Sequence, residues 1–231
     1  MPSCMPDQTE SLFPTLIYRA SLPNSGRLNH ELEQAASALA ESDMAGRRWC
    51  LKHGYAGYTS YGSLADLPER SEPFSRLKRL IEQRAARFAR DLHWDLRGGK
   101  PLCDSMWVNV LPEGGSHSSH LHTNAVLSGT YYVKTPPGAA PIVFEDPRHA
   151  MMMAAPPRKA TAPRPFRTYV SSEPAPGALI LWESWLRHEV PLNRAEGERI
   201  SVSFNLIDCG EVAGSSTLST PSISRPSDRG W

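Results

Sequence analysis

The residues after Gly98-Gly99 constrain the fold most, because from there to about residue 207 short β-rich segments alternate with turns. The segments consist largely of β-branched, aromatic and other apolar residues, and Pro- and Gly-containing stretches separate them. This pattern is typical of strands joined by tight turns. We expect strands at 106–111, 125–133, 141–145, 168–171, 178–182 and 199–207. Several short strands in succession predict a β-sandwich or jelly roll.

The sequence before this region is largely helical. Residues 29–42 carry apolar side chains at three- and four-residue steps, and residues 71–96 form a longer amphipathic pattern that begins with a serine N-cap. The basic face of this second helix is most simply a solvated surface. Residues 12–18 predict an edge strand, because Pro14 cannot donate to a β-ladder. Residues 54–62 predict a loop with a strand fragment.

The length of 231 residues fits one domain, and we place it at residues 1–209. Helices at about 27–97 would support a β core at about 105–207, so we expect an α+β, mainly-β chain. The Ser-, Thr- and Pro-rich residues 210–231 predict a disordered tail. Residues 147–167 have no periodicity, and their Met, Pro and Arg content makes this long loop a candidate lid over a substrate.

The composition argues against several classes of protein. A net charge of +1 gives no electrostatic case for a nucleic-acid or membrane partner. The four cysteines show no CxxC pairing, which argues against a zinc ribbon or a disulfide framework and fits a reducing compartment. No apolar run reaches the length of a membrane span, and the first residues lack the pattern of a signal peptide. We therefore expect a cytoplasmic protein, with a homodimer through the N-terminal helices as one option.

Three histidines and an arginine point to a metal site. Residues i and i+2 of a strand point to the same face, so His120 and His122 can converge on one ion, with His188 reaching it from across the sandwich. Imidazoles suit Fe(II), and three ligands on one side of the metal leave positions open. Arg199, with Ser201 beside it, can pair with both oxygens of a carboxylate. A lone His-x-His pair is a weak signal that surface histidines also produce, but the combination predicts a metal site beside a carboxylate site.

These residues lie in motifs that resemble the putative 2-oxoglutarate–Fe(II) oxygenase family, which is mostly bacterial and phage-borne and is similar in architecture to prolyl hydroxylases. The resemblance covers roughly residues 105–207 and rests on motifs in one order: Trp107-Val-Asn-Val, His120-Leu-His122, Leu127-Ser-Gly-Thr-Tyr-Tyr-Val133, Phe144-Glu-Asp-Pro-Arg148, residues 176–188 and Glu198-Arg-Ile-Ser-Val-Ser-Phe-Asn205. It implies a double-stranded β-helix (a cupin-like jelly roll) and a dioxygenase that uses Fe(II), 2-oxoglutarate and O₂, with ascorbate as an optional addition. The expected reaction is hydroxylation of a C–H bond with release of succinate and CO₂. The resemblance leaves the substrate open, whether small molecule, peptide or protein.

The resemblance also implies roles for individual residues. His120 and His188 would bind iron, and Arg199 with Ser201 would hold the far carboxylate of 2-oxoglutarate. Further candidates for contacts to the cosubstrate are His117, Asn109 and one of Tyr131 and Tyr132, since neighbouring residues of a strand face opposite ways. The candidates for the substrate cavity are Trp182, Trp185 and Asn205, for which core packing or a structural hydrogen bond is the competing interpretation.

The sequence departs from the wider superfamily at one position. That superfamily usually has His-x-Asp or His-x-Glu, whereas this chain has His122 where the carboxylate is expected. Three neutral imidazoles would leave more positive charge on the iron. We favour His122 as the third ligand, because its spacing needs no loop rearrangement. In the alternatives, Asp146 supplies the carboxylate, or His122 binds the substrate.

Two other functions compete with the oxygenase interpretation. A three-histidine cupin-like dioxygenase would act without 2-oxoglutarate, but such an enzyme has no need of the Arg199 clamp. A jelly-roll module that binds a metal or ligand without catalysis is the second, although only three strong ligands are visible and structural zinc takes four.

Overall fold

The computed structural model describes residues 7–208. The tail predicted at 210–231 lies outside these residues. Among the described helices, none combines the length and the apolar character that crossing a membrane requires. The cytoplasmic location and the homodimer stay predictions.

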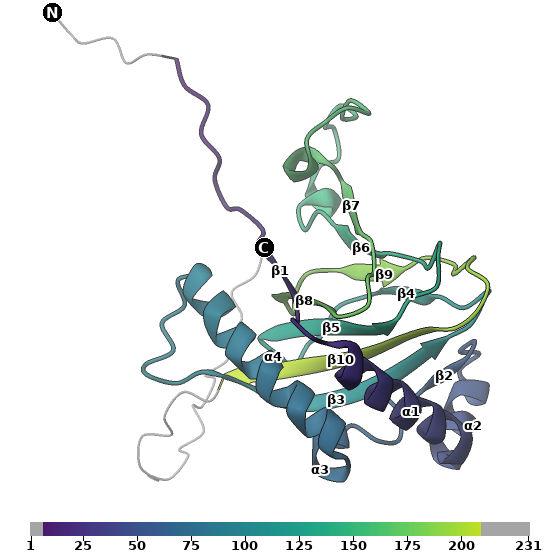
Figure 1. The fold of residues 1–231 in the computed structure, drawn as a ribbon. Coiled ribbons are helices and arrows are strands. Elements are labelled where there is room, and N and C mark those ends of the chain that lie inside the picture. Colours follow the sequence, from purple (N-terminus) through teal and green to yellow (C-terminus); the bar gives the residue numbers. More distant parts are fainter. Residues whose placement is uncertain (1–6, 209–231) are drawn as a thin grey trace, which may run out of the picture.

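Two antiparallel sheets form the body of the molecule (Figure 1). The larger sheet has the order β1-β8-β5-β10-β3-β2, and the smaller sheet has the order β4-β9-β6-β7. The strands of the larger sheet are β1 (Ile17–Ser21), β8 (Ala178–Glu183), β5 (Leu127–Lys134), β10 (Arg199–Asp208), β3 (Pro101–Leu111) and β2 (Tyr58–Thr59). Those of the smaller sheet are β4 (His117–His120), β9 (His188–Val190), β6 (Ile142–Glu145) and β7 (Tyr169–Ser172). The predicted α+β jelly roll is confirmed.

Strand β10 shows how the sequence directs side chains to the two faces of the larger sheet. Ile200, Val202 and Phe204 enter the main apolar core, whereas Arg199 and Ser201 line a cavity on the other face. Alternation along a strand sends neighbouring side chains to opposite faces. One face of β10 therefore stabilises the fold, and the other supplies polar groups to the space between the sheets.

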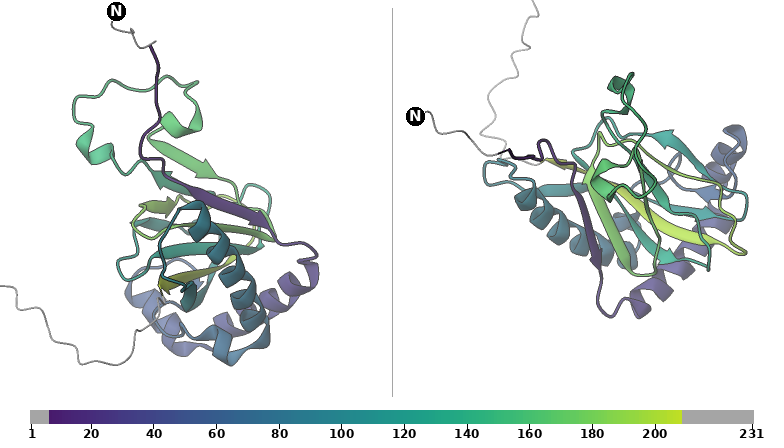
Figure 2. Two further views of the ribbon diagram at one scale, coloured as in Figure 1. Left: turned by 90° about the vertical axis from the view of Figure 1, so that its left-hand side faces the viewer. Right: turned by 90° about the horizontal axis from the view of Figure 1, so that it is seen from above.

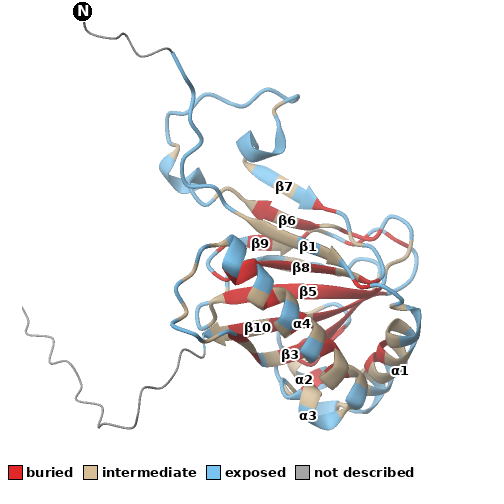
Figure 3. Ribbon diagram, turned by 60° about the vertical axis from the view of Figure 1, so that its left-hand side comes forward, coloured by how far each residue is buried: buried red, intermediate tan, exposed pale blue. Residues whose placement is uncertain are grey.

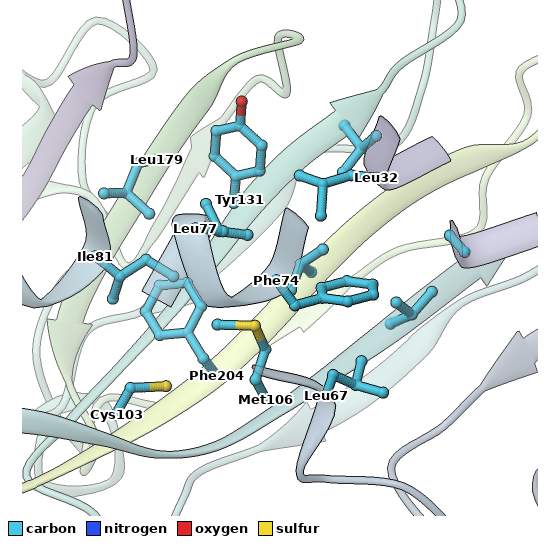
Figure 4. Close-up of a cluster of buried hydrophobic side chains, with 14 of the residues drawn as sticks. Leu32, Leu67, Phe74, Leu77, Ile81, Cys103, Met106, Tyr131, Leu179 and Phe204 are labelled. Carbon is cyan, nitrogen blue, oxygen red and sulfur yellow. The ribbon is translucent and has the colours of Figure 1, made fainter. Parts of the chain in front are cut away.

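Helices cover the outer face of the larger sheet. The elements are α1 (Gly26–Ser42), α2 (Met44–Lys52), α3 (Leu67–Arg70) and α4 (Glu72–Asp91). Figure 4 shows the core that they build with the sheet, to which Leu32 of α1, Leu77 of α4 and Phe204 of β10 contribute. The helices predicted at 29–42 and 71–96 are confirmed, but α4 ends earlier because His93 adopts a positive φ of 55°. The short helices α2 and α3 were not predicted.

The loop between β6 and β7 extends away from the sandwich and is mostly exposed (Figure 3). It contains two short 3-10 helices, η1 (His149–Met151) and η2 (Arg164–Phe166). On the larger sheet the edge strand predicted at 12–18 begins only at Ile17, so Pro14 lies outside the ladder. The edge strands β1 and β7 thus stand at the end of their sheets, near this loop.

Candidate metal centre

Three histidines meet at one end of the space between the sheets. The ligand atoms offered by His120, His122 and His188 all lie within 4.8 Å of one another, and no other described Asp, Glu, His or Cys joins the group. The ring centroids of His120 and His188 are 4.4 Å apart, and each lies 5.2 Å from that of His122. The structure therefore brings together the three histidines that the sequence nominated as ligands.

Strand pairing positions two of these rings and a loop contact positions the third. His120 ends β4 and is the register partner of His188 in β9. The spacing suggested that strand alternation brings the His122 ring to the His120 ring. Strand β4 stops at His120, so alternation does not do this. Instead, the backbone N–H of His122 donates to the carbonyl of Ser184 at 3.0 Å, which ties the chain after β4 to the turn before β9.

Hydrogen bonds fix the tautomers of two of the rings. Nδ1 of His120 lies 2.7 Å from the carbonyl oxygen of Ser118, and Nδ1 of His188 lies 2.9 Å from that of Leu186. A carbonyl can only accept, so both rings carry their proton on Nδ1 and keep a lone pair on Nε2. This arrangement orients a histidine as a metal ligand.

Burial keeps two of the rings neutral near pH 7. Burial lowers the pKa of His188 to about 3 and that of His122 to about 4, and the neighbouring His120 adds to both shifts. Metal ligation requires neutral imidazole, so these two groups do not have to lose a proton before they bind a cation.

Arg199 is a buried cation that has no counter-ion among residues 7–208. The residue is 2% exposed, its Nη1 donates to Oγ of Ser201 at 3.2 Å, and no carboxylate of residues 7–208 pairs with it. Its Nε has no hydrogen-bond partner within this part of the chain, and neither has the hydroxyl of Tyr132, whose ring centroid lies 4.9 Å from the guanidinium carbon. A buried unpaired charge is costly. The two unpartnered donors therefore form a site suited to an anion.

The histidines and Arg199 line one cavity that opens to solvent. Of the other predicted residues, His117, Ser201 and Trp182 also line it. Nε2 of His117 is hydrogen-bonded to the hydroxyl of Tyr55 at 2.7 Å. Burial and the charge of Arg199 lower the pKa of His117 to about 3, so this ring too is neutral.

Asp146 does not join the histidines. Its carboxylate accepts two bonds from the guanidinium of Arg148, at 3.0 and 2.9 Å, and this arginine holds its pKa below the usual value. The structure thus offers no carboxylate at the cluster, and the alternative in which Asp146 completes the ligand set has no geometric support within residues 7–208.

Several predicted residues lie outside the cavity. The hydroxyl of Tyr131 donates to Oδ1 of Asn29 in the core under the helices, so of the two tyrosines only Tyr132 faces the space between the sheets. Trp185 is 46% exposed, and Asn205 accepts a bond from Ser128 at 2.9 Å. Asn109 does not line the cavity, but its side chain donates a hydrogen bond at 3.0 Å to Oγ of Ser203, which does.

Other side chains of this region were not predicted as site residues. Trp107, Thr130 and Ser203 line the cavity, and Tyr55 holds His117. Ser203 continues the alternation of Arg199 and Ser201 along β10, which was a usable signal. Tyr55 follows α2, far from His117 in the sequence, and no local pattern connects the two.

Comparison with known proteins agrees with this geometry. The model of a family described as "Putative 2OG-Fe(II) oxygenase" matches residues 105–205, whereas a search of the curated proteins found no match. Among solved structures, a prolyl-4-hydroxylase from Pseudomonas putida is 15% identical with a TM-score of 0.56, over 85% of this chain and 94% of that chain. A collagen prolyl hydroxylase of Paramecium Bursaria Chlorella virus-1, solved with 2OG, is 12% identical with a TM-score of 0.53, over 82% and 94%.

The chain spans only 60% of a third protein, a 2OG-Fe(II) oxygenase-family oxidoreductase from Burkholderia pseudomallei. That likeness has 17% identity and a TM-score of 0.44 over 61% of this chain. The other two structures support the double-stranded β-helix fold. The matched residues include the three histidines and Arg199, and the cofactors of the family are Fe(II), 2-oxoglutarate and O₂. Residues 105–205 are therefore similar to the putative 2OG-Fe(II) oxygenase family, and the rest of the chain supports the same fold.

Proposed function

We propose that the chain hydroxylates a C–H bond of its substrate and converts 2-oxoglutarate and O₂ to succinate and CO₂. His120, His122 and His188 would hold the iron, and Arg199 with Ser201 would hold the far carboxylate of 2-oxoglutarate. The observation that carries the proposal is the buried guanidinium of Arg199, which has no counter-ion in residues 7–208 and shares a cavity with the three histidines.

The donor set fits ferrous iron. Two of the imidazoles have their Nδ1 protons engaged by backbone carbonyls, which leaves Nε2 free to bind. Three protein ligands leave positions open for a chelating keto acid and O₂. When bound, the iron supplies the oxidising chemistry, and the protein contributes positioning and a shaped cavity.

The anion site fits a dicarboxylate. Arg199 offers Nε–H, and Tyr132 offers a hydroxyl whose pKa burial raises, so that it stays protonated and can donate. His117 lies in the same cavity and is held by Tyr55, which makes it a candidate for a further contact to the cosubstrate. Since these donors are fixed before the cosubstrate arrives, little ordering would accompany its binding.

The three-histidine ligand set suits an anionic cosubstrate. Neutral ligands leave the full charge of a divalent cation in place, and Arg199 adds a second positive centre across the cavity. A carboxylate at each end of 2-oxoglutarate would meet one of these two centres. Trp182 would form part of the wall against which the substrate packs, since its ring lies 4.7 Å from that of His188 and its Nε1 has no partner in the described chain.

A cupin-like dioxygenase that does not use 2-oxoglutarate is the second candidate, and the three-histidine set favours it. Measurements of O₂, 2-oxoglutarate and succinate in solutions of the Fe(II)-loaded protein separate the two functions. We expect O₂ uptake with equal loss of 2-oxoglutarate and gain of succinate. Arg199→Gln should abolish it, and Arg187→Gln, which removes an arginine that is about half exposed, should not. Oxygen uptake that leaves 2-oxoglutarate intact would favour the cupin function. Tetrahedral zinc without turnover would favour a binding module.

A further inference from the structure

A second, larger cavity lies between the N-terminal segment 10–19 and the β6–β7 loop. Its walls come from these two stretches, which run side by side in the left view of Figure 2, and its floor includes Phe144 and Leu186. Its volume is about 600 Å³ and it is open to solvent. Small-molecule sites commonly measure about 300–1,000 Å³, so the size of the groove alone does not select its ligand, and the chemistry of its walls does. We call it the distal groove.

The charges of the distal groove are unbalanced. Arginines 19, 158, 164 and 167 line it, and no carboxylate within residues 7–208 pairs with any of them. Of its three carboxylates, that of Asp146 is held by Arg148, and that of Glu145 lies 4.0 Å from Arg187. Among the described residues that line the groove, only the carboxylate of Glu10 is left to offset four guanidinium groups, so the groove favours a ligand with several negative charges.

Two of these arginines come from opposite walls. Arg19 lies on β1 and Arg164 lies in η2. Burial lowers the pKa of Arg19, and the positive charge of Arg164 lowers it further. The structure therefore holds like charges close to each other, an arrangement that an anion between them would relieve.

The rest of the surface suits a polypeptide. The groove also exposes apolar side chains, among them Phe13 and Phe166, which are 88% and 57% exposed. Strand β1 ends the larger sheet and β7 ends the smaller one, so an edge with free backbone groups borders the groove on each side. Extended peptides bind such edges through backbone hydrogen bonds, and their side chains enter neighbouring pockets.

The floor residues of the distal groove contact the histidines of the metal centre. The ring centroid of Phe144 lies 6.1 Å from that of His188, and the carbonyl of Leu186 accepts the Nδ1 proton of the same histidine. The turn that contains Leu186 also contains Ser184, whose carbonyl binds the N–H of His122. One face of this turn thus borders the groove, and its other face borders the histidines.

We propose that the distal groove binds an extended acidic segment of a polypeptide substrate, adjacent to the residue that the metal centre modifies. The proposal rests on the proposed function for the meaning of that adjacency, but the binding itself does not require the metal. It assigns the substrate to acidic polypeptides rather than to small metabolites. The arginines supply charge complementarity, and the sheet edges and aromatic side chains supply contact area.

The test is fluorescence anisotropy with the full-length, metal-free chain. The probe is a labelled peptide that alternates Glu with Ala, about ten residues long and roughly 33 Å when extended. The matched probe has Gln in place of Glu. We expect the acidic peptide to bind at low salt at least about tenfold more tightly than the Gln peptide, since several guanidinium–carboxylate pairs add up. The affinity should fall as salt screens these pairs.

Paired variants locate the binding. The double substitution Arg19→Gln with Arg164→Gln should weaken binding of the acidic peptide by roughly tenfold. The control double substitution, Arg87→Gln with Arg90→Gln, removes the same charge from the exposed face of α4 and should leave the affinity unchanged. Absence of binding to the wild type, or equal weakening in both doubles, would overturn the proposal. Tighter binding of a single-stranded RNA of equal charge would also overturn it and assign the groove to nucleic acid.

The peptide-binding test and the test of the oxygenase function can fail independently of each other. The groove double variant should keep its affinity for iron and 2-oxoglutarate, which depends on the histidines and Arg199. Peptide binding without 2-oxoglutarate binding would contradict the proposed oxygenase function and support the peptide-binding role of the distal groove. Binding of 2-oxoglutarate without peptide binding would contradict the role of the distal groove and support the oxygenase function.

Discussion

His120 and His188 are register partners across β4 and β9, and their ring centroids lie 4.4 Å apart. Two short strands far apart in the sequence therefore assemble most of the candidate metal centre through backbone pairing. The carbonyls of Ser118 and Leu186, each two residues before its histidine, then orient the rings. The site is organised by the fold, which predicts that it exists in the metal-free protein.

Substitution of His122 should separate the competing ligand sets. We expect His122→Ala to weaken binding of Fe(II) by more than about 100-fold, because loss of a group that merely orients a ligand already costs 10–100-fold. Asp146→Ala should leave iron affinity unchanged, because this carboxylate is engaged by Arg148. Equilibrium competition with a coloured chelator measures both. Full affinity in His122→Ala together with a loss in Asp146→Ala would reverse the assignment.

Replacement of Arg199 by Met should make the protein more stable but weaken its binding of 2-oxoglutarate. The variant removes a buried cation that has no counter-ion in the described chain, so we expect the free energy of unfolding without ligand to rise by about 1–2 kcal/mol. Affinity for 2-oxoglutarate should fall by about 2–5 kcal/mol in free energy. Urea unfolding and calorimetric titration measure the two effects. A variant that is much less stable and still binds 2-oxoglutarate would mean that the arginine is structural.

The sequence predicted the elements whose signals are local. Alternation along 199–207 indicated β10 and the face of Arg199, and the apolar stripe of 71–96 indicated α4. The short helix α2 was missed, since it depends on the Asp43 side chain, which accepts a bond from the Gly46 N–H at 2.9 Å. In the sequence alone, an aspartate that caps a helix cannot be distinguished from any other aspartate in a loop.

The candidate site was predicted in its residue types but only partly in its geometry. The resemblance to the family implied that His120 and His188 meet, and the spacing of His122 suggested that it joins them. The three rings do lie together, but His122 is held there by Ser184 and not by strand alternation. Tyr55 could not be found, because its contact with His117 depends on where the loop after α2 settles. Long-range contacts between loops leave no periodic trace in a sequence.

The Tyr55–His117 pair should influence the cosubstrate but not the metal. Tyr55→Phe removes one hydrogen bond and leaves the ring packing, so we expect affinity for 2-oxoglutarate to fall by about 1 kcal/mol, or roughly fivefold. Iron affinity should stay the same. Tyr61→Phe, which changes an exposed tyrosine, is the matched control. Equal effects of the two variants would remove Tyr55 from the site.

The Asp43 cap should make stability depend on pH. Burial raises the pKa of the Asp43 carboxyl, but the bonds that it accepts from the Gly46 N–H and from the hydroxyls of Ser63 and Tyr58 outweigh this effect. Together they hold the pKa below the ordinary 3.8. The stabilisation is therefore present above pH 3.8 and is lost as the pH falls through the lower folded value. We expect Asp43→Asn to cost about 1 kcal/mol at pH 7, because an amide nitrogen cannot accept the bonds that Oδ2 accepts from Tyr58 and Ser63. Urea unfolding should show this deficit shrink as the pH falls below 3.8, and a deficit that widens there would contradict the sign.

The most direct test of the metal and cosubstrate assignment is an anaerobic absorption titration of the Fe(II)-loaded protein with 2-oxoglutarate. We predict a weak visible charge-transfer band that saturates with one equivalent in the wild type. It should be absent in His188→Ala at any concentration, and in Arg199→Met it should require far more 2-oxoglutarate. A wild type that binds iron but develops no band, or a band that Arg199→Met leaves unchanged, would contradict the account.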